Sequence, residues 1–284
     1  MSVVVLEGPA DPDVPLLLDS PHSGAQYPAD FRPEVAMERC RRAEDFDVDV
    51  LFGEAPALGI PLWKALFPRI YVDVNRDRGD LDPAMVDGVL PFPLAPSAKA
   101  RLGKGVIWMD APPPPEPTPL YAEALSAPDI AHRLKNHWEP YRHGLAERLS
   151  AIRLKHGRAY YLDCHSMPSV SSAMHEEGAG IARAEIVLGD GDGTTCSGNF
   201  TRRVAELLAA EGFEVAVNTP YKGADLIRKE GRPAEGLHAL QIEVRRDLYM
   251  NENAVTRSPR FADTRARLGK FLAALQSELA NNPI

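Results

Sequence analysis

The chain has 284 residues, of which 44% are hydrophobic and 25% are charged, and its formal net charge is −8. This composition is typical of a globular protein and excludes extended disorder, while the acidic excess argues against nucleic-acid binding through a basic surface. No apolar run approaches the ~20 residues of a membrane-spanning helix, no signal peptide is recognisable, and the three cysteines form no C-x-x-C pair. We therefore expect a cytoplasmic protein with neither membrane nor nucleic-acid partners.

The first expected strand leads into a histidine. Residues 14–19 (VPLLLD) form a short apolar run that predicts a buried strand, and His22 follows within Ser-Pro-His-Ser-Gly. Ligands of open α/β sheets bind beyond the carboxyl ends of strands, so His22 lies where chemistry is expected. Residues 33–52 then predict a helix that carries a cluster of acidic side chains.

Two more strands are expected at residues 59–66 and 70–74, and the second runs directly into Asn75 and Arg76. Residues 80–120 have no regular pattern and contain a polyproline run. A loop of this length inside a compact domain is usually functional. We therefore expect this segment to cover the site.

The clearest helix is expected at residues 129–156, where apolar side chains recur at steps of three and four. A strand at residues 158–163 follows and delivers His165 at its end. His165 should therefore lie at the same edge of the sheet as His22.

The rest of the chain alternates between strands and helices. In chain order these are strand 185–188, helix 199–212, strand 213–218, strand 238–244 and helix 261–279. The alternation predicts a three-layer α/β fold, in which helices cover both faces of a mixed, mostly parallel sheet. Because no linker-like change in composition divides the chain, we expect one domain over residues 1–284.

His22 and His165 predict a metal site. Neutral imidazole is a common metal ligand, and catalytic zinc typically takes three protein ligands and a water. The third ligand would then be a carboxylate, for which Glu44, Asp45 and Asp47 are candidates. The competing interpretation is two turn histidines bonded to the backbone and a solvated acidic helix face.

Charged residues also follow or occupy other strands. Alternation places Gln241, Glu243 and Arg245 on one face of the last strand. A carboxylate there is costly without a partner, so Glu243 either forms a salt bridge to Arg245 or Arg246 or acts as a general base beside the metal-bound water. Asn75 and Arg76 follow another expected strand, and the guanidinium of Arg76 has the forked geometry that binds carboxylates. The competing interpretation is that Arg76 pairs with the neighbouring aspartates.

Seven blocks carry a resemblance to a known family. They are Asp19-Ser-Pro-His-Ser-Gly24, Asp45 to Phe52, Tyr71-Val-Asp-Val-Asn-Arg76, Asp163-Cys-His-Ser166, Gly193-Thr-Thr-Cys196, Asn218-Thr-Pro-Tyr-Lys-Gly223 and His238-Ala-Leu-Gln-Ile-Glu-Val-Arg245. With these blocks in this order, the chain resembles the N-formylglutamate amidohydrolase family. That family is similar to zinc carboxypeptidases and aspartoacylases, which implies a phosphorylase/hydrolase-like fold.

The resemblance implies one divalent metal ion, zinc, with His22, Asp45 and His165 as its ligands. The related hydrolases commonly use an H-x-x-E motif, but Ala25 stands three residues after His22. The third ligand is therefore expected elsewhere in the chain, at Asp45 or at one of its two acidic neighbours named above.

The resemblance also implies a reaction, the hydrolysis of N-formyl-L-glutamate to formate and L-glutamate in histidine catabolism. Glu243 and Arg76 would be catalytic, Asn75 and Arg76 would bind the substrate carboxylate, and Tyr221 and Lys222 would line the pocket. The partner would be a small anionic molecule. The alternatives are a hydrolase of other N-acyl amino acids or small peptides and, because the H-x-x-E carboxylate is missing, a non-catalytic metal- or amino-acid-binding protein. The oligomeric state stays open.

Overall fold

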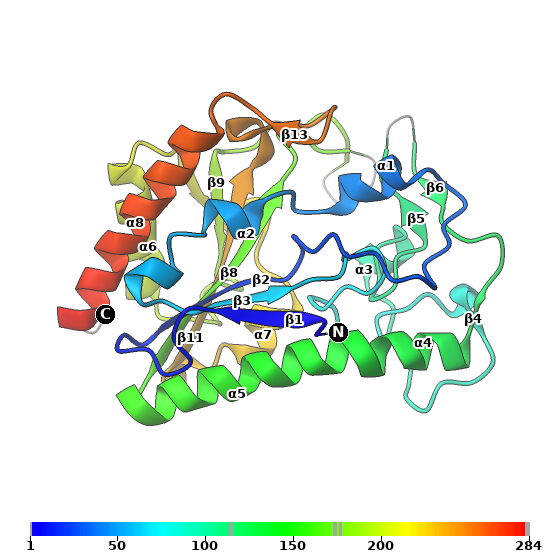
Figure 1. The fold of residues 1–284 in the computed structure, drawn as a ribbon, viewed down its shortest axis with the longest axis horizontal. Helices are drawn as coiled ribbons and strands as arrows, with labels where there is room; N and C mark the ends of the chain where they lie inside the picture. The colour runs from blue at the N-terminus through cyan, green and yellow to red at the C-terminus, as the bar shows by residue number, and fades with distance from the viewer. Residues whose placement is uncertain (1, 114–115, 173–174, 176–177, 282–284) are drawn as a thin grey trace.

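A seven-stranded sheet forms the centre of the protein (Figure 1). The computed structural model describes residues 2–113, 116–172, 175 and 178–281. The spatial order of the strands is β1 (Val4–Glu7), β3 (Leu62–Ala65), β2 (Leu16–Ser20), β8 (Ala159–Met167), β11 (Leu237–Arg245), β9 (Ile186–Gly189) and β10 (Val215–Val217). The β1–β3 and β11–β9 pairs are antiparallel, and the other pairs of this sheet are parallel. The expected mixed, mostly parallel sheet is confirmed.

Helices cover both faces of this sheet. On one face lie α4 (Ala127–Arg133), a π-helical turn (Leu134–Trp138), α5 (Glu139–His156) and α7 (Asp225–Glu230). On the other lie α2 (Val48–Leu51), α6 (Gly198–Ala210) and α8 (Phe261–Asn281). Strand alternation divides the core accordingly, since Leu17 and Tyr161 pack toward α5 while Leu16 and Leu162 pack toward α8. The three-layer architecture is confirmed.

The continuous helix expected at residues 33–52 is wrong. The chain instead forms α1 (Met37–Cys40), a 3-10 turn (Arg41–Ala43) and α2. Glu44 is extended, and Asp47 has a left-handed φ of 54°. The break has a physical reason, because the backbone N–H of Asp45 leaves the helical pattern and donates to the carbonyl of His22 at 3.0 Å.

The strand expected at residues 70–74 is also wrong. This run is buried but turns instead of joining the sheet. Val72 and Val74 lie in the core, and the Asp73 N–H donates to the Val106 carbonyl at 2.7 Å. A short apolar run indicates burial without specifying a ladder partner.

Residues 80–120 contain short elements packed on the molecule. These are a 3-10 turn (Pro83–Met85), β4 (Val86–Asp87), α3 (Ala98–Arg101), β5 (Asp110–Ala111) and β6 (Thr118–Pro119). Of the expected polyproline run, residues 114–115 lie outside the described residues. Leu81, Val106 and Ile107 of this segment are fully buried.

The remaining elements are small, and the sequence pattern predicted none of them. They are β7 (Leu125–Ser126), which pairs with β4, the β12 (Met250–Asn251) and β13 (Thr256–Arg257) hairpin, and 3-10 turns at Pro56–Leu58, Pro233–Glu235 and Arg246–Leu248. Within the described part of the chain, no helix is long and apolar enough to cross a bilayer.

Candidate active site

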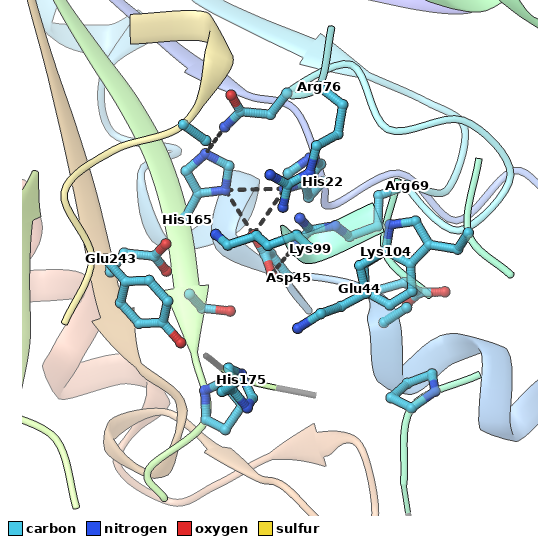
Figure 2. Close-up of a pocket in the computed structure, with 18 of the residues that line it drawn as sticks. His22, Glu44, Asp45, Arg69, Arg76, Lys99, Lys104, His165, His175 and Glu243 are labelled. Atoms are coloured by element: carbon cyan, nitrogen blue, oxygen red, sulfur yellow. Dashed lines mark hydrogen bonds and ion pairs between the residues drawn. The ribbon is translucent and has the colours of Figure 1, made fainter. Parts of the chain in front are cut away.

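Three ligand-type side chains meet at one edge of the sheet (Figure 2). His22 lies just beyond β2, His165 lies within β8, and Asp45 lies in the break before α2. The two Nδ1 atoms are 3.0 Å apart, and Asp45 Oδ2 is 3.0 Å from His165 Nδ1 and 3.4 Å from His22 Nδ1. All three side chains are buried. The structure thus brings together the two predicted histidines and one of the three candidate carboxylates.

The other ring nitrogens of both histidines face carboxylates. His22 Nε2 is 2.7 Å from Asp73 Oδ1, and His165 Nε2 is 2.7 Å from Asp163 Oδ1. Asn75 Nδ2 donates to Asp163 Oδ2 at 3.1 Å. Asp73 accepts from His22 Nε2, which fixes the tautomer of His22 and leaves its Nδ1 as a lone-pair donor. His165 Nε2 also lies 3.0 Å from the Asn75 side-chain nitrogen, so its tautomer depends on which of the two neighbours it bonds. Both Nδ1 atoms face the shared space as potential ligands.

Arginines hold the second oxygen of Asp45. Its Oδ1 lies 3.1 Å from Arg246 Nη2 and 3.4 Å from Arg69 Nη1. Burial alone would raise the pKa of Asp45, but Arg69 and the two imidazoles outweigh it and hold this pKa well below its usual range. Asp45 is therefore a carboxylate at neutral pH, with Oδ2 directed at the histidines.

The two alternative carboxylates have other partners. Glu44 Oε1 accepts from the Tyr27 hydroxyl at 2.8 Å. Asp47 Oδ2 lies 2.6 Å from Arg257 Nε. Neither lies in the group of possible metal ligands formed by the two histidines. Of the three candidate carboxylates, Asp45 is the one placed to share a metal ion with them.

Glu243 lies beside the three ligand-type side chains on the neighbouring strand. It is the register partner of His165 in the parallel β8–β11 pair, and it is 8% exposed. Gln241 Nε2 donates to Glu243 Oε1 at 2.9 Å. Burial raises the pKa of Glu243 to about 7, against the opposing charge of His165. A carboxyl group with this pKa can exchange a proton near neutrality, as a general acid or base requires.

A cavity of about 820 Å³ opens over these groups. Arg76 and Asn75 line it from the turn that follows residues 70–74. The Arg76 Nε atom is buried and has no hydrogen-bond partner among the described residues, and burial lowers the pKa of this guanidinium. A buried guanidinium is poorly solvated, and a carboxylate that accepts its hydrogen bonds would stabilise its charge.

Tyr221 and Lys222 also line the cavity, while the Asn75 side chain bonds to other parts of the protein as well. The Asn75 Oδ1 atom accepts from the Leu226 N–H at 2.8 Å. The Lys222 ammonium is 3.0 Å from Asp192 and is half exposed at the rim. His175, a loop histidine, also lines the cavity.

Residues 80–120 supply the opposite wall of the cavity. Lys99, Lys104 and Trp108 line it from this segment. Trp108 Nε1 donates to Asp73 Oδ2 at 3.2 Å, which ties the segment to the partner of His22.

The sequence pattern missed several of these residues. Asp73 and Asp163 each stand inside an apolar run, where a buried charge requires a partner, and this signal could have marked them. Lys99 and Trp108 come from a segment without periodicity, so no pattern pointed to them. Arg246 was expected as a possible partner of Glu243 but pairs with Asp45 instead.

Comparison with known proteins places this geometry in context. The model of the N-formylglutamate amidohydrolase family matches residues 14–250. An N-formylglutamate deformylase from Pseudomonas aeruginosa is 28% identical over 92% of each chain. A second one, from Pseudomonas putida, is 27% identical over 84% of this chain and 83% of its own. The crystal structure of N-formylglutamate amidohydrolase from Ralstonia eutropha JMP134 is 39% identical, with a TM-score of 0.91 over 98% of this chain and 99% of its own.

Proposed function

Since the chain belongs to the N-formylglutamate amidohydrolase family and is an amidohydrolase, we propose that it hydrolyses N-formyl-L-glutamate to formate and L-glutamate, a step of histidine catabolism. One divalent metal ion, zinc, would be bound by His22, Asp45 and His165. The observation that carries the proposal is the convergence of three buried ligand atoms, with Glu243 beside them.

The residues fit a zinc ion. Bonds of about 2.0–2.2 Å in a tetrahedron separate neighbouring ligand atoms by about 3.3–3.5 Å, close to the 3.0 to 3.4 Å between the two Nδ1 atoms and Asp45 Oδ2. Two imidazoles and one carboxylate match the donor set of catalytic zinc, which keeps a fourth position open. When bound, zinc polarises the amide carbonyl and lowers the pKa of a water molecule.

Glu243 would move the protons. Its carboxylate would accept a proton from the attacking water and then deliver it to the nitrogen of the leaving amine. Burial raises its pKa to about 7, which suits both steps near neutral pH. Gln241 would hold one oxygen of Glu243 through its 2.9 Å hydrogen bond and leave the other for water.

Arg76 would bind a carboxylate of the substrate and would support the oxyanion. Its buried Nε without a described partner supports this role. Asn75 would belong to the same clamp, chiefly by holding Asp163 and thereby His165, because its amide is hydrogen-bonded there. The clamp would fix the amide carbon within reach of the attacking water.

Tyr221 and Lys222 would complete the wall of the substrate cavity. Both line it from the loop before α7. Lys222 pairs with Asp192 at the rim, so it would shape the wall rather than bind a substrate carboxylate.

The test is an assay of formate and glutamate release by the purified protein. The protein would be stripped of metal with a chelator and then supplied with zinc. We expect turnover of N-formyl-L-glutamate with zinc and loss of turnover without it. A protein that binds zinc but hydrolyses nothing would instead be a binding protein, and faster cleavage of other N-acyl amino acids or small peptides would reassign the substrate.

A further inference from the structure

Among the cations that line the cavity besides Arg76, Lys99 enters it from α3. Figure 2 shows its side chain extending across the pocket toward Glu243 and His165, whereas Arg76 descends beside His22. The Lys99 Nζ atom lies 5.9 Å from the centre of the Tyr221 ring. Its positive charge also opposes the effect of burial on the pKa of Glu243. The ammonium group therefore lies in the cavity, near the reacting centre.

The position of Lys99 is fixed by a buried carboxylate. Asp80 is 5% exposed, and its two oxygens accept from the backbone N–H of Ser97 at 2.6 Å and from the Ser97 hydroxyl at 3.0 Å. Ser97 Oγ in turn accepts from the Ala100 N–H at 3.2 Å and caps α3. The Lys104 N–H closes the turn on the Lys99 carbonyl at 2.9 Å. The lysine thus comes from a segment with fixed geometry.

The proposed substrate needs two cationic sites. An N-acyl glutamate carries an α-carboxylate and a side-chain carboxylate that lies several bonds from the amide carbon. Arg76 would bind one carboxylate, but the second would enter a pocket that already contains Asp45 and Glu243. The carboxylates of Asp45 and Glu243 would repel this second substrate carboxylate unless a nearby cation offset their charge. Figure 2 shows Lys99 on the Glu243 side of the pocket, where its positive charge would offset this repulsion.

We propose that Lys99 binds the side-chain carboxylate of the substrate, so that the enzyme selects N-acyl amino acids with acidic side chains. This inference rests on the proposed function and adds the residue that determines specificity. Lys99 would make a charge-assisted hydrogen bond to the carboxylate, beside the ring of Tyr221. The competing role for the same ammonium is direct stabilisation of the amide oxygen in the transition state.

A pair of isosteric substrates separates these roles. N-formyl-L-glutamate and N-formyl-L-glutamine share the scissile amide and the α-carboxylate and differ in the side-chain charge. The kcat/KM of each would be measured for the wild type, Lys99→Met and Lys99→Arg. Lys155→Met serves as the matched control, because it also removes one lysine charge but lies on α5 beside Asp11, outside the cavity.

We expect Lys99→Met to lose about 10- to 100-fold in kcat/KM for the glutamate substrate and less than about threefold for the glutamine substrate. Lys99→Arg should recover most of the loss, and Lys155→Met should match the wild type. Retained activity on the glutamine substrate shows that the variant is folded. Equal losses on both substrates, no loss on either, or a wild type without preference would overturn the assignment. A wild type inactive on both substrates with zinc would overturn the proposed function itself.

Discussion

The cavity has two walls built in different ways. A strand wall (His22, His165 and Glu243) lies on or beside β2, β8 and β11, and a cover wall (Lys99 and Trp108) comes from residues 80–120. Strand register and the carboxylates of Asp73 and Asp163 fix the strand wall, whereas a helix cap and a turn anchored by Asp80 fix the cover wall. This difference suggests a division of labour, in which the strand wall carries metal binding and proton transfer and the cover wall sets which substrate binds.

The largest expected effect is on the strand wall, from Glu243→Gln. The change keeps the shape and the hydrogen bond to Gln241 but removes the proton acceptor. Turnover should fall by about 10²- to 10⁴-fold, while the zinc content of the purified protein stays at the wild-type value. Formate release and metal analysis of the same preparation would measure both. Unchanged turnover would remove Glu243 from its proposed role, and lost zinc would make it a ligand.

The next largest effect is expected from Asp163→Asn, which tests whether Asp163 orients His165 as a metal ligand or only stabilises the fold. Asp163→Asn leaves His165 without the carboxylate that faces its Nε2 at 2.7 Å. Loss of such a partner typically costs about 10- to 100-fold in metal affinity or activity. Asp190→Asn is the matched control, because Asp190 is also buried but pairs with Thr201 and Asn218 and does not line the cavity. Competition with a chelator would measure affinity, and similar losses in the two variants would indicate a purely structural effect.

The pH dependence of kcat/KM should also be set by a residue of the strand wall, Glu243. Burial raises the pKa of Glu243 to about 7, and a cation bound beside it would lower that value. Because a base must be deprotonated to accept a proton, kcat/KM should fall about tenfold per pH unit below this pKa. The acid limb should therefore lie at or below neutrality. The residual activity of Glu243→Gln should lack this limb, and a limb that survives the substitution would belong to another group.

The same division explains how much could be predicted from the sequence. The strands that lead to His22 and His165 were predicted from short apolar runs, and the strand of Glu243 was recognised with its alternation. β8 is longer than expected and contains His165 instead of ending before it. The break that delivers Asp45 was not predicted, because it depends on a tertiary hydrogen bond to the carbonyl of His22. The position of Lys99 depends on a cap and a turn anchored by one distant carboxylate, which has no period in the sequence.

The smallest expected effect tests the cover wall through Ser97→Ala. Loss of this cap should cost α3 about 0.5–2 kcal/mol and loosen Lys99 without removing its charge. The KM for N-formyl-L-glutamate should then rise by about two- to tenfold, while kcat and zinc affinity stay unchanged. Ser126→Ala is the matched control, because Ser126 caps α4 through the Asp129 N–H in the same way and α4 does not line the cavity. If Ser97→Ala lowers kcat or zinc affinity instead, the two walls act as one unit, with Trp108 and its 3.2 Å bond to Asp73 as the connection.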